Sequence, residues 1–436
     1  MIRAAFTALL AAGLTAATVP ETLEARLERA SKALQSGDAR GAVEHFIAAS
    51  REAPHTPALH LAAAEALARS GRSGEAVPFL QRAARLGGVG SLKRLEDAFA
   101  ASLTVAGVTA AIDALKANAS PLTGGRVAWT LEEKDLIPEN VAWDPEHDVF
   151  YVGSLYKRKI VKVGRDGAVS DFVPQAGSGI WAVLGMKVEP RRRELWANAC
   201  NPMEPTPPMV PDDPETRGRT GVFRFDLRSG RLVGKHVTGS REAPVCFNDL
   251  VITPDGGAWL SAGPDGIWRV TPGTESPVRV VEYQGFVNGI AASDDGALIF
   301  LADHLRGVQV MQAATREVRA LRLPEDVTLS GIDGLYVRGR TLVAVQNGLG
   351  SSPNQVAQAE LDPSLSQVTC HAVLDRNRPE FDIPTTGVLV KDELFYVASS
   401  QLRAFDGGVI WPPERLTKST ILRTPLAGPG CRTAKG

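Results

Sequence analysis

Four polar residues occupy the same place in a unit that recurs along the second part of the chain. Each stands two residues before a short apolar stretch, and they are Glu139, Asn248, Asn288 and Asp333. If they converge, two carboxylates and two amide oxygens suit a hard cation such as calcium, which takes about six to eight oxygen ligands. We expect a calcium ion or another divalent cation there, and the absence of Cys and His from these positions argues against zinc.

The same place in the two remaining units is taken by Leu184 and Thr386, which are weak ligands or none. The coordination shell would then be incomplete and leave room for water or substrate. A cation held in this way can polarise an ester carbonyl and stabilise the oxyanion that forms when water attacks it.

Such a reaction also needs a base that activates the water. Asp303 and His304 follow a predicted strand on the side where the four polar residues lie, and a histidine titrates near neutral pH. We predict His304, with Asp303, as catalytic residues. The alternatives are a solvated loop histidine and an aspartate that only ends a strand.

Further loops at the same side predict a substrate pocket. Tyr156 follows another predicted strand, and Trp411 precedes two prolines in a late loop, so both are candidate substrate-binding residues. The proline-rich insertion at residues 201–219 is either a lid or substrate wall, or a disordered crossover.

The element that must position these residues is a repeated group of strands. Six units of about four short strands recur at roughly 40–65 residues, with turns such as Asp295-Gly296 between strands, and this pattern is typical of a six-bladed β-propeller. The first strand of each blade lines the central channel. The predicted first strands are residues 141–144, 186–189, 250–253, 290–293, 335–337 and 388–390.

The last unit lacks a fourth strand after residues 419–424. An unpartnered strand is predicted at residues 126–131, before the first unit. We expect this early strand to complete the sixth blade, so that no sheet edge stays open.

A helical segment precedes the propeller. Residues 21–119 show apolar residues at helical spacing, and Gly37, Ala42 and Phe46 recur 34 residues later as Gly71, Ala76 and Leu80. This period resembles the tetratricopeptide repeat. The segment is either a docking groove for a peptide or protein, or a helical cap packed on its neighbour. Residues 120–125 are a linker, and the propeller is expected over residues 126–430.

The first twenty residues predict a secretory signal peptide, with Arg3 followed by an uncharged Ala- and Leu-rich run; the alternative is a first helix. Export to the periplasm or outside the cell would allow the four cysteines to pair. Cys200, Cys246, Cys370 and Cys431 allow three connectivities.

Composition excludes several other classes of protein. The 436 residues are 44% hydrophobic and 22% charged, with a formal net charge of −1. Nothing points to nucleic acid or to an anionic membrane surface, and no stretch is long and apolar enough to span a bilayer.

The motifs resemble a known family. Residues 137–144, Asn248-Asp249, Val287-Asn288-Gly289 and residues 331–334 are similar to the gluconolactonase/regucalcin (senescence-marker) family and its paraoxonase-like relatives. The resemblance covers about residues 125–426.

The resemblance implies hydrolysis of lactones or related esters. It also implies that the four polar residues bind calcium and that Asp333 acts as a base as well as a ligand. By the same resemblance, Asn140 and Asp249 could hold a second calcium ion.

Two functions follow from these observations. The first is an exported calcium-dependent hydrolase of lactones or esters acting on a small molecule. The second is a non-enzymatic scaffold, in which calcium stabilises the propeller and the helices or the rim bind a protein or glycan. A base within reach of the metal discriminates between them.

Overall fold

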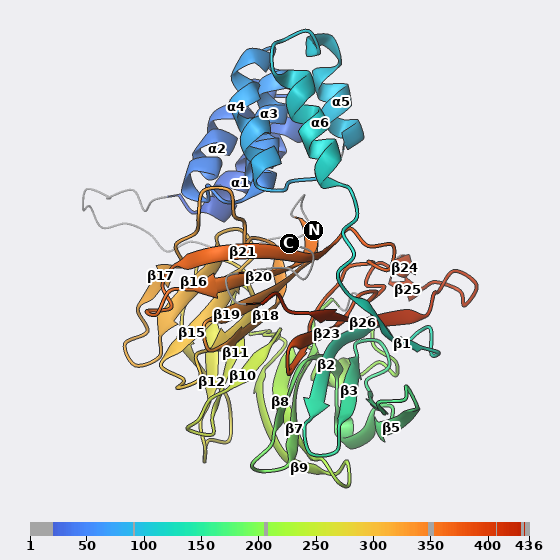
Figure 1. Ribbon diagram of the computed structural model, residues 1–436. Coiled ribbons are helices and arrows are strands. Elements are labelled where there is room, and N and C mark those ends of the chain that lie inside the picture. Colours follow the sequence, from blue (N-terminus) through green and yellow to red (C-terminus); the bar gives the residue numbers. More distant parts are fainter. Residues whose placement is uncertain are drawn as a thin grey trace.

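The computed structural model describes residues 21–89, 92–204, 208–347, 353–406, 408–428 and 431. The proposed signal peptide, residues 1–20, lies outside the described residues. The described chain folds into a group of helices followed by a six-bladed β-propeller, which confirms the predicted fold class (Figure 1).

Helices that are consecutive in the chain pack against each other in antiparallel pairs. We call α1 to α6 the helical unit. They are α1 Leu23–Gln35, α2 Ala39–Glu52, α3 Pro57–Arg69, α4 Ser73–Arg85, α5 Leu92–Phe99 and α6 Val108–Asn118, with a short 3-10 helix at Ala100–Ser102. Thr22 and Asp38 cap α1 and α2 by accepting bonds from backbone N–H groups at 3.2 and 2.8 Å.

The repeated positions found in the sequence are structurally equivalent in the helical unit. Gly37 and Gly71 both adopt positive φ, +85° and +82°, in the turns after α1 and α3. Phe46 of α2 and Leu80 of α4 are buried in the same apolar cluster. The predicted helices are therefore present, while their assignment to the tetratricopeptide class remains a prediction.

Six four-stranded antiparallel sheets form the blades of the propeller within the described chain. Blades one to three contain β2 Pro138–Asp144, β3 Val149–Ser154, β4 Ile160–Val163 and β5 Val169–Val173; β6 Ala182–Glu189, β7 Glu194–Asn201, β8 Arg219–Asp226 and β9 Leu232–Gly239; and β10 Leu250–Ile252, β11 Ala258–Ser261, β12 Ile267–Val270 and β13 Val278–Val281. Blades four and five contain β14 Val287–Ala292, β15 Leu298–Asp303, β16 Gly307–Gln312 and β17 Val318–Ala320; and β18 Ile332–Arg338, β19 Thr341–Asn347, β20 Asn354–Leu361 and β21 Val368–Arg376.

The sixth blade is built from both ends of the propeller sequence. It contains β22 Gly387–Val390, β23 Glu393–Val397, β26 Ser419–Pro425 and β1 Arg126–Leu131, in the sheet order β1-β26-β23-β22. β1 pairs antiparallel with β26, as predicted. A two-stranded hairpin, β24 Phe405–Asp406 and β25 Val409–Ile410, lies between β23 and β26. The early strand thus closes the ring of blades.

The core lies between neighbouring blades, where strands with continuous apolar runs face one another. Blades one and two share a cluster that includes Tyr151, Met186, Phe223 and Phe225, all close to fully buried. Strands buried on both faces have near-continuous apolar runs, as the second strand of each blade does.

Both disulfides in the described chain tie the propeller together. Cys200 of β7 pairs with Cys246 ahead of β10, and Cys370 of β21 pairs with Cys431 beyond β26. The structure thereby selects one of the three connectivities, and this pairing is compatible with an oxidising, extracytoplasmic location. Among the described helices, none has both the length and the apolarity that crossing a membrane requires.

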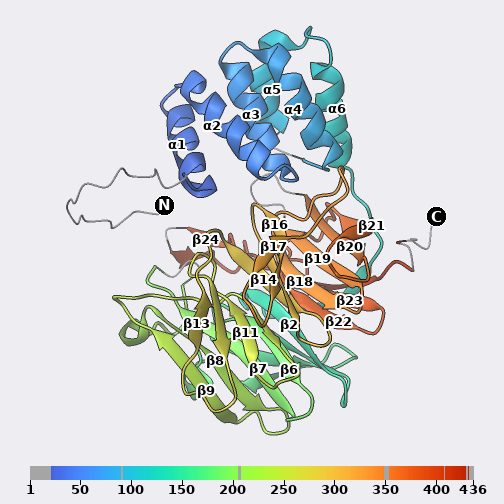
Figure 2. The ribbon, with the colours of Figure 1, turned by 90° about the vertical axis from the view of Figure 1, so that its left-hand side faces the viewer.

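The helical unit rests on one end of the propeller. Figures 1 and 2 show it beside the elements of blades four and five, close to β16, β17, β20 and β21. The strand pairing of Val287 with Asp303 places the loop after β15 on the same face as the start of β14. The helical unit therefore packs against the face at which the inner strands begin, which we call the ring face.

Candidate active site

The ring positions lie at irregularities in the inner strands. We call Glu139, Leu184, Asn248, Asn288, Asp333 and Thr386 the ring residues. The pairing between first and second strands shifts register at residues 138–140, 183–186, 287–290 and 332–334, so four ring residues lie in β-bulges. A bulge redirects a side chain out of the regular alternation of a strand, and here it supports the convergence of polar groups at the channel.

The bulges also correct the predicted strand starts. β14 begins at Val287 and β18 at Ile332, so Asn288 and Asp333 lie inside these strands and not two residues ahead of them. Glycine follows both residues. A Cβ on Gly289 would lie 2.5 Å from the backbone oxygen of Asp333, and one on Gly334 would lie 3.1 Å from Cα of Thr386. The absent side chain lets each inner strand approach the next blade closely.

Direct contacts join ring residues of neighbouring blades. Asn288 Nδ2 donates to Asp333 Oδ1 at 3.1 Å, and Asn248 Nδ2 donates to the carbonyl of Val287 at 3.3 Å. On the other side of the ring, Thr386 Oγ1 donates to the backbone carbonyl of Glu139 at 2.9 Å. These bonds connect blade three to four, blade four to five and blade six to one at the starts of the inner strands.

Three carboxylic acids are buried at the centre, and the charges of Asp249 and Asp333 disfavour ionisation of Glu139. Burial, with the nearby carboxylates of Asp333 and Asp249, raises the pKa of Glu139 well above its ordinary value. Burial raises the pKa of Asp333 to about 7, although amide donors from Asn347 and Asn288 oppose the shift. Burial likewise raises the pKa of Asp249. A bound cation would relieve this repulsion.

The donor set fits a hard cation. Glu139 Oε2, Asn140 Oδ1 and Asp249 Oδ2 are buried without a hydrogen-bond partner, and buried oxygen atoms without partners are costly. No group of three or more His, Cys, Asp or Glu side chains in the described ranges is arranged to hold a metal ion. The four proposed ligands do not form such a group, because two of them, Asn248 and Asn288, are asparagines and only two are carboxylates.

Lys187 is a residue that the sequence analysis missed. Its Nζ lies 3.3 Å from Asp249 Oδ1 and 5.6 Å from the centre of the Tyr336 ring. Asn140 Nδ2 is directed to Thr386 Oγ1 at 2.5 Å. Lys187 thus supplies a positive charge at the position considered for a second calcium ion. Its place three residues after ring residue Leu184, on an inner strand, was the available signal.

Asn347 is a second missed residue. It ends β19, and its Nδ2 donates to Asp333 Oδ2 at 3.1 Å. Each oxygen of Asp333 therefore accepts one hydrogen bond from a side-chain amide, Oδ1 from Asn288 and Oδ2 from Asn347. The carboxylate is 3% exposed and held in one orientation, as a catalytic base or a metal ligand requires.

Asp303 is built into a turn. Its Oδ1 accepts the backbone N–H groups of Leu305 at 2.9 Å and Arg306 at 2.7 Å, and its Oδ2 lies 3.4 Å from Arg306 Nη1. The side chain is 1% exposed. These contacts give Asp303 a structural role in the turn, and its catalytic role remains a prediction.

His304 lies beside the segments that lead into the ring. Its backbone N–H donates to the carbonyl of Phe286 at 2.9 Å, and its carbonyl accepts from Gly331 N–H at 2.8 Å. Phe286 and Gly331 each precede a ring residue by two positions. Burial lowers the pKa of the His304 imidazole, which favours its neutral form.

Tyr156 and Trp411 belong to an apolar cluster that reaches the ring. Both are half-buried and pack against the same core as ring residue Leu184, together with Phe405 and Ile410. The ring centres of Tyr156 and Phe405 are 6.0 Å apart. The two predicted substrate-binding residues therefore belong to one apolar cluster with ring residue Leu184.

The described part of the insertion after β7 is folded against blades one and two. Val210 N–H donates to the carbonyl of Tyr156 at 2.7 Å, and Met209 is 2% exposed. Arg158 donates to the carbonyl of Pro211 at 2.7 Å and lies 3.5 Å from Asp213. These contacts favour the predicted wall over a disordered crossover; residues 205–207 lie outside the described chain.

Comparison with known proteins gives structural likenesses only. No protein-family model and no curated protein sequence matches the chain. Solved structures that it resembles include a gluconolactonase from Xanthomonas campestris, with 15% identity over 71% of this chain and 92% of that one, at a TM-score of 0.45.

Two other solved propellers give similar values. A calcium-binding regucalcin from Agrobacterium tumefaciens shows 13% identity over 72% of this chain and 100% of that one, with a TM-score of 0.45. A luciferin-regenerating enzyme shows 14% identity over 72% and 97%, with a TM-score of 0.46. At these identities the activities of these proteins are not transferred to this chain.

Proposed function

We propose that this protein is an exported, calcium-dependent hydrolase of lactones or related esters. The observation that carries the proposal is the hydrogen bond between Asn288 and Asp333, together with the buried, unpartnered oxygen of Glu139, whose ionisation the nearby Asp333 carboxylate disfavours. With Asn248, these residues form the proposed ligand set. Calcium is the divalent cation that fits an all-oxygen set of irregular geometry. The sequence resemblance to the gluconolactonase/regucalcin family supports the same reaction class.

The ring residues and His304 would have different roles in the reaction. A divalent cation bound there would supply polarisation of an ester or lactone carbonyl and stabilisation of the oxyanion. Asp333, held by two amides, is oriented to take a proton from the attacking water. His304, at the rim, is the second candidate for that proton, and a neutral imidazole suits the task.

The apolar cluster that contains Leu184 would hold the rest of the substrate. Tyr156 and Trp411 would supply apolar contacts there, and the ordered insertion with Met209 would form an adjoining wall. Pockets of this kind bind small molecules through apolar walls and a few polar groups. A small-molecule lactone or ester is therefore the proposed substrate.

The test is turnover of aldonolactones, acyl lactones and aryl esters with and without a chelator. We expect chelation to abolish hydrolysis and added calcium to restore it. Asp333→Ala should lower kcat/KM by about 100-fold or more, since it removes a ligand and a base. Glu317→Gln, in an exposed turn on the opposite face, is the control.

Two results would count against the proposal. If Asp333→Ala and His304→Ala both leave hydrolysis unchanged, the site is wrong. If calcium raises the melting temperature but no substrate turns over, the protein is better described as a calcium-stabilised scaffold for a protein or glycan.

A further inference from the structure

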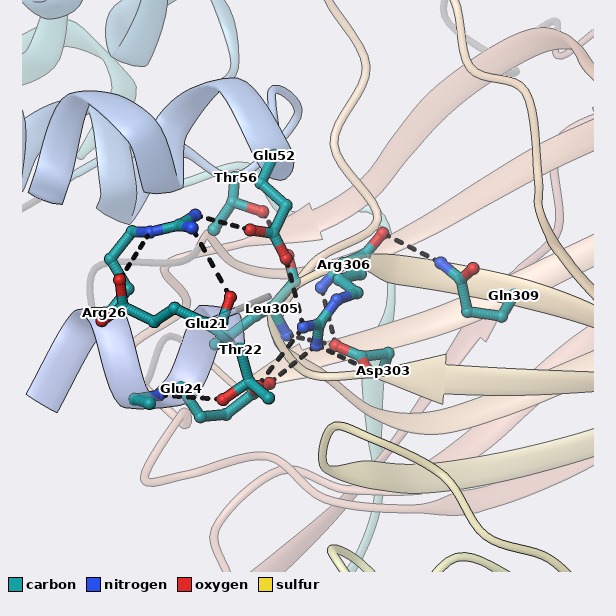
Figure 3. Close-up of polar contacts among 11 residues, drawn as sticks. Glu21, Thr22, Glu24, Arg26, Glu52, Thr56, Asp303, Leu305, Arg306 and Gln309 are labelled. Carbon is teal, nitrogen blue, oxygen red and sulfur yellow. Dashed lines mark hydrogen bonds and ion pairs between the residues drawn. The ribbon is translucent and has the colours of Figure 1, made fainter. Parts of the chain in front are cut away.

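The loop between β15 and β16 is bound by the helical unit (Figure 3). Arg306 Nη1 lies 2.7 Å from Glu24 of α1, and Nη2 lies 3.4 Å from Glu52 of α2. The same guanidinium lies 3.4 Å from the buried carboxylate of Asp303. One side chain therefore links two helices to the end of a propeller strand, and a planar guanidinium is suited to such a bridge.

The neighbouring residue adds an apolar contact. Leu305 packs against a cluster that includes the buried side chains of Leu23, Ala49 and Leu59. Thr56, at the start of α3, donates its hydroxyl to the carbonyl of Leu305. The loop is thus inserted between α1, the end of α2 and the start of α3.

The connection from blade four to blade five is also held by the helical unit. Arg82 of α4 lies 3.6 Å from Glu325 and 3.7 Å from Asp326. His55 Nδ1 lies 2.9 Å from the carbonyl of Val327. These residues precede β18, the strand that carries Asp333. The helical unit therefore contacts the two residues that follow His304 and the segment that leads to Gly331, one of the two residues bonded to the His304 backbone.

The backbone of His304 connects this interface to the ring. It bonds to Phe286 on one side and Gly331 on the other, each two residues from a proposed metal ligand. The next two residues along the chain, Leu305 and Arg306, are the ones held by helices. His304 is consequently fixed between the ring segments and the helical unit.

We propose that the helical unit supports the active site: by binding Leu305 and Arg306, it fixes the backbone of His304 beside the segments that carry Asn288 and Asp333 and so orients its imidazole. This inference rests on the proposed function, in which His304 handles a proton. Arg306 is then a positioning residue, since it acts through the loop and touches no substrate. The inference also gives the helices a catalytic role in addition to any docking role.

The test compares Arg306→Gln and Leu305→Ala with Arg338→Gln, a matched control. Arg338 pairs with Asp392 at 3.2 Å in an exposed position away from the helical unit. The first readout is the NMR signal of His304 in protein with labelled histidine, assigned among the seven histidines with His304→Ala. We expect both loop variants, and not Arg338→Gln, to shift that signal.

The second readout is kinetic. Arg306→Gln should lower kcat by roughly tenfold or more with KM changed less than about twofold, because a displaced base slows chemistry and not binding. Arg306→Lys keeps the positive charge and should therefore retain a higher kcat than Arg306→Gln. Proteolysis within residues 120–125 reports whether the helical unit has come loose.

An unmoved His304 signal overturns the inference, whether or not the linker becomes sensitive to protease. A shifted signal with unchanged kcat overturns it as well. If the signal shifts but wild type hydrolyses no member of the substrate panel, the helices still position His304, and the proposed hydrolase function is what fails.

Discussion

At the residue scale, the candidate site depends on polar side chains that strand bulges direct to the channel. Asn288 and Asp333 are bonded to each other across two blades, and glycine after each allows the close approach. Glu139 is coupled to Asp333 by charge repulsion. The site is therefore a set of acids and amides held together at a cost that a cation would offset.

Calcium binding is the prediction that belongs to this scale. Calcium should raise the melting temperature of the wild-type protein, because a ligand that binds only the folded state stabilises it. Glu139→Gln removes one of two carboxylate ligands and should weaken calcium binding by about tenfold or more. Calorimetric titration measures the affinity.

The matched control is Glu317→Gln, which makes the same chemical change at an exposed turn. Equal affinities of Glu139→Gln and wild type for calcium would remove Glu139 from the ligand set.

At the element scale, neighbouring blades are joined by ion pairs at their turns. Asp144 ends β2, and Arg193 stands in the turn between β6 and β7. The two form two contacts, 2.6 Å between Nη1 and Oδ1 and 2.8 Å between Nη2 and Oδ2. The Asp144 side chain is 1% exposed, while that of Arg193 is 29% exposed, so the carboxylate is shielded from water. Blades one and two are thus held by charge as well as by apolar packing.

This pair predicts a stability that depends on pH. Burial alone would raise the pKa of Asp144, but bonds from Arg193 and His147 outweigh it and lower the pKa to about 2. The folded pKa is below the unfolded value, so the stabilisation is complete above about pH 4 and is lost as the pH falls through about 2. Its size is about 2 kcal/mol.

Urea unfolding of wild type and Asp144→Asn between pH 2 and 6 measures this contribution. The difference in unfolding free energy should be about 2 kcal/mol at pH 6 and should shrink toward pH 2. Asp392→Asn, at a side chain 93% exposed, should show little difference at any pH. A difference for Asp144→Asn that stays constant with pH would contradict the assignment.

At the scale of the whole molecule, the chain is closed by contacts between distant segments. β1 completes the blade that β26 ends, and Cys431 is linked to Cys370 of blade five, 61 residues earlier. The helical unit adds contacts to blades four and five. Each of these contacts restrains a segment that would otherwise be a free end of the propeller.

Loss of the Cys370–Cys431 link should therefore lower stability. A loop of 61 residues corresponds to about 4 kcal/mol of chain entropy in the unfolded state, which is an upper value. Cys370→Ser with Cys431→Ser should lower the free energy of unfolding by a few kcal/mol and leave calcium affinity unchanged, since neither residue is near the ring. A matching loss of calcium affinity would show that the link also shapes the site.

Sequence alone determined the repeating pattern and hence much of the fold. Apolar runs of strand length, Asp-Gly turns and the spare strand at residues 126–131 specify six blades and their closure, because strand periodicity and turn chemistry are local. The ring positions followed, since a residue at a fixed place in each blade must lie at a fixed distance from the axis.

Only the tertiary structure decided which groups meet at those positions and what holds them. The roles of Lys187 and Asn347, and the two hydrogen bonds that side-chain amides donate to Asp333, depend on tertiary contacts. No local sequence pattern indicates these contacts. The disulfide pairing and the insertion of Leu305 and Arg306 into the helical unit likewise could not be predicted from the sequence. Such contacts join residues up to 282 positions apart, as between Glu24 and Arg306, and their partners are fixed by the packing of whole elements.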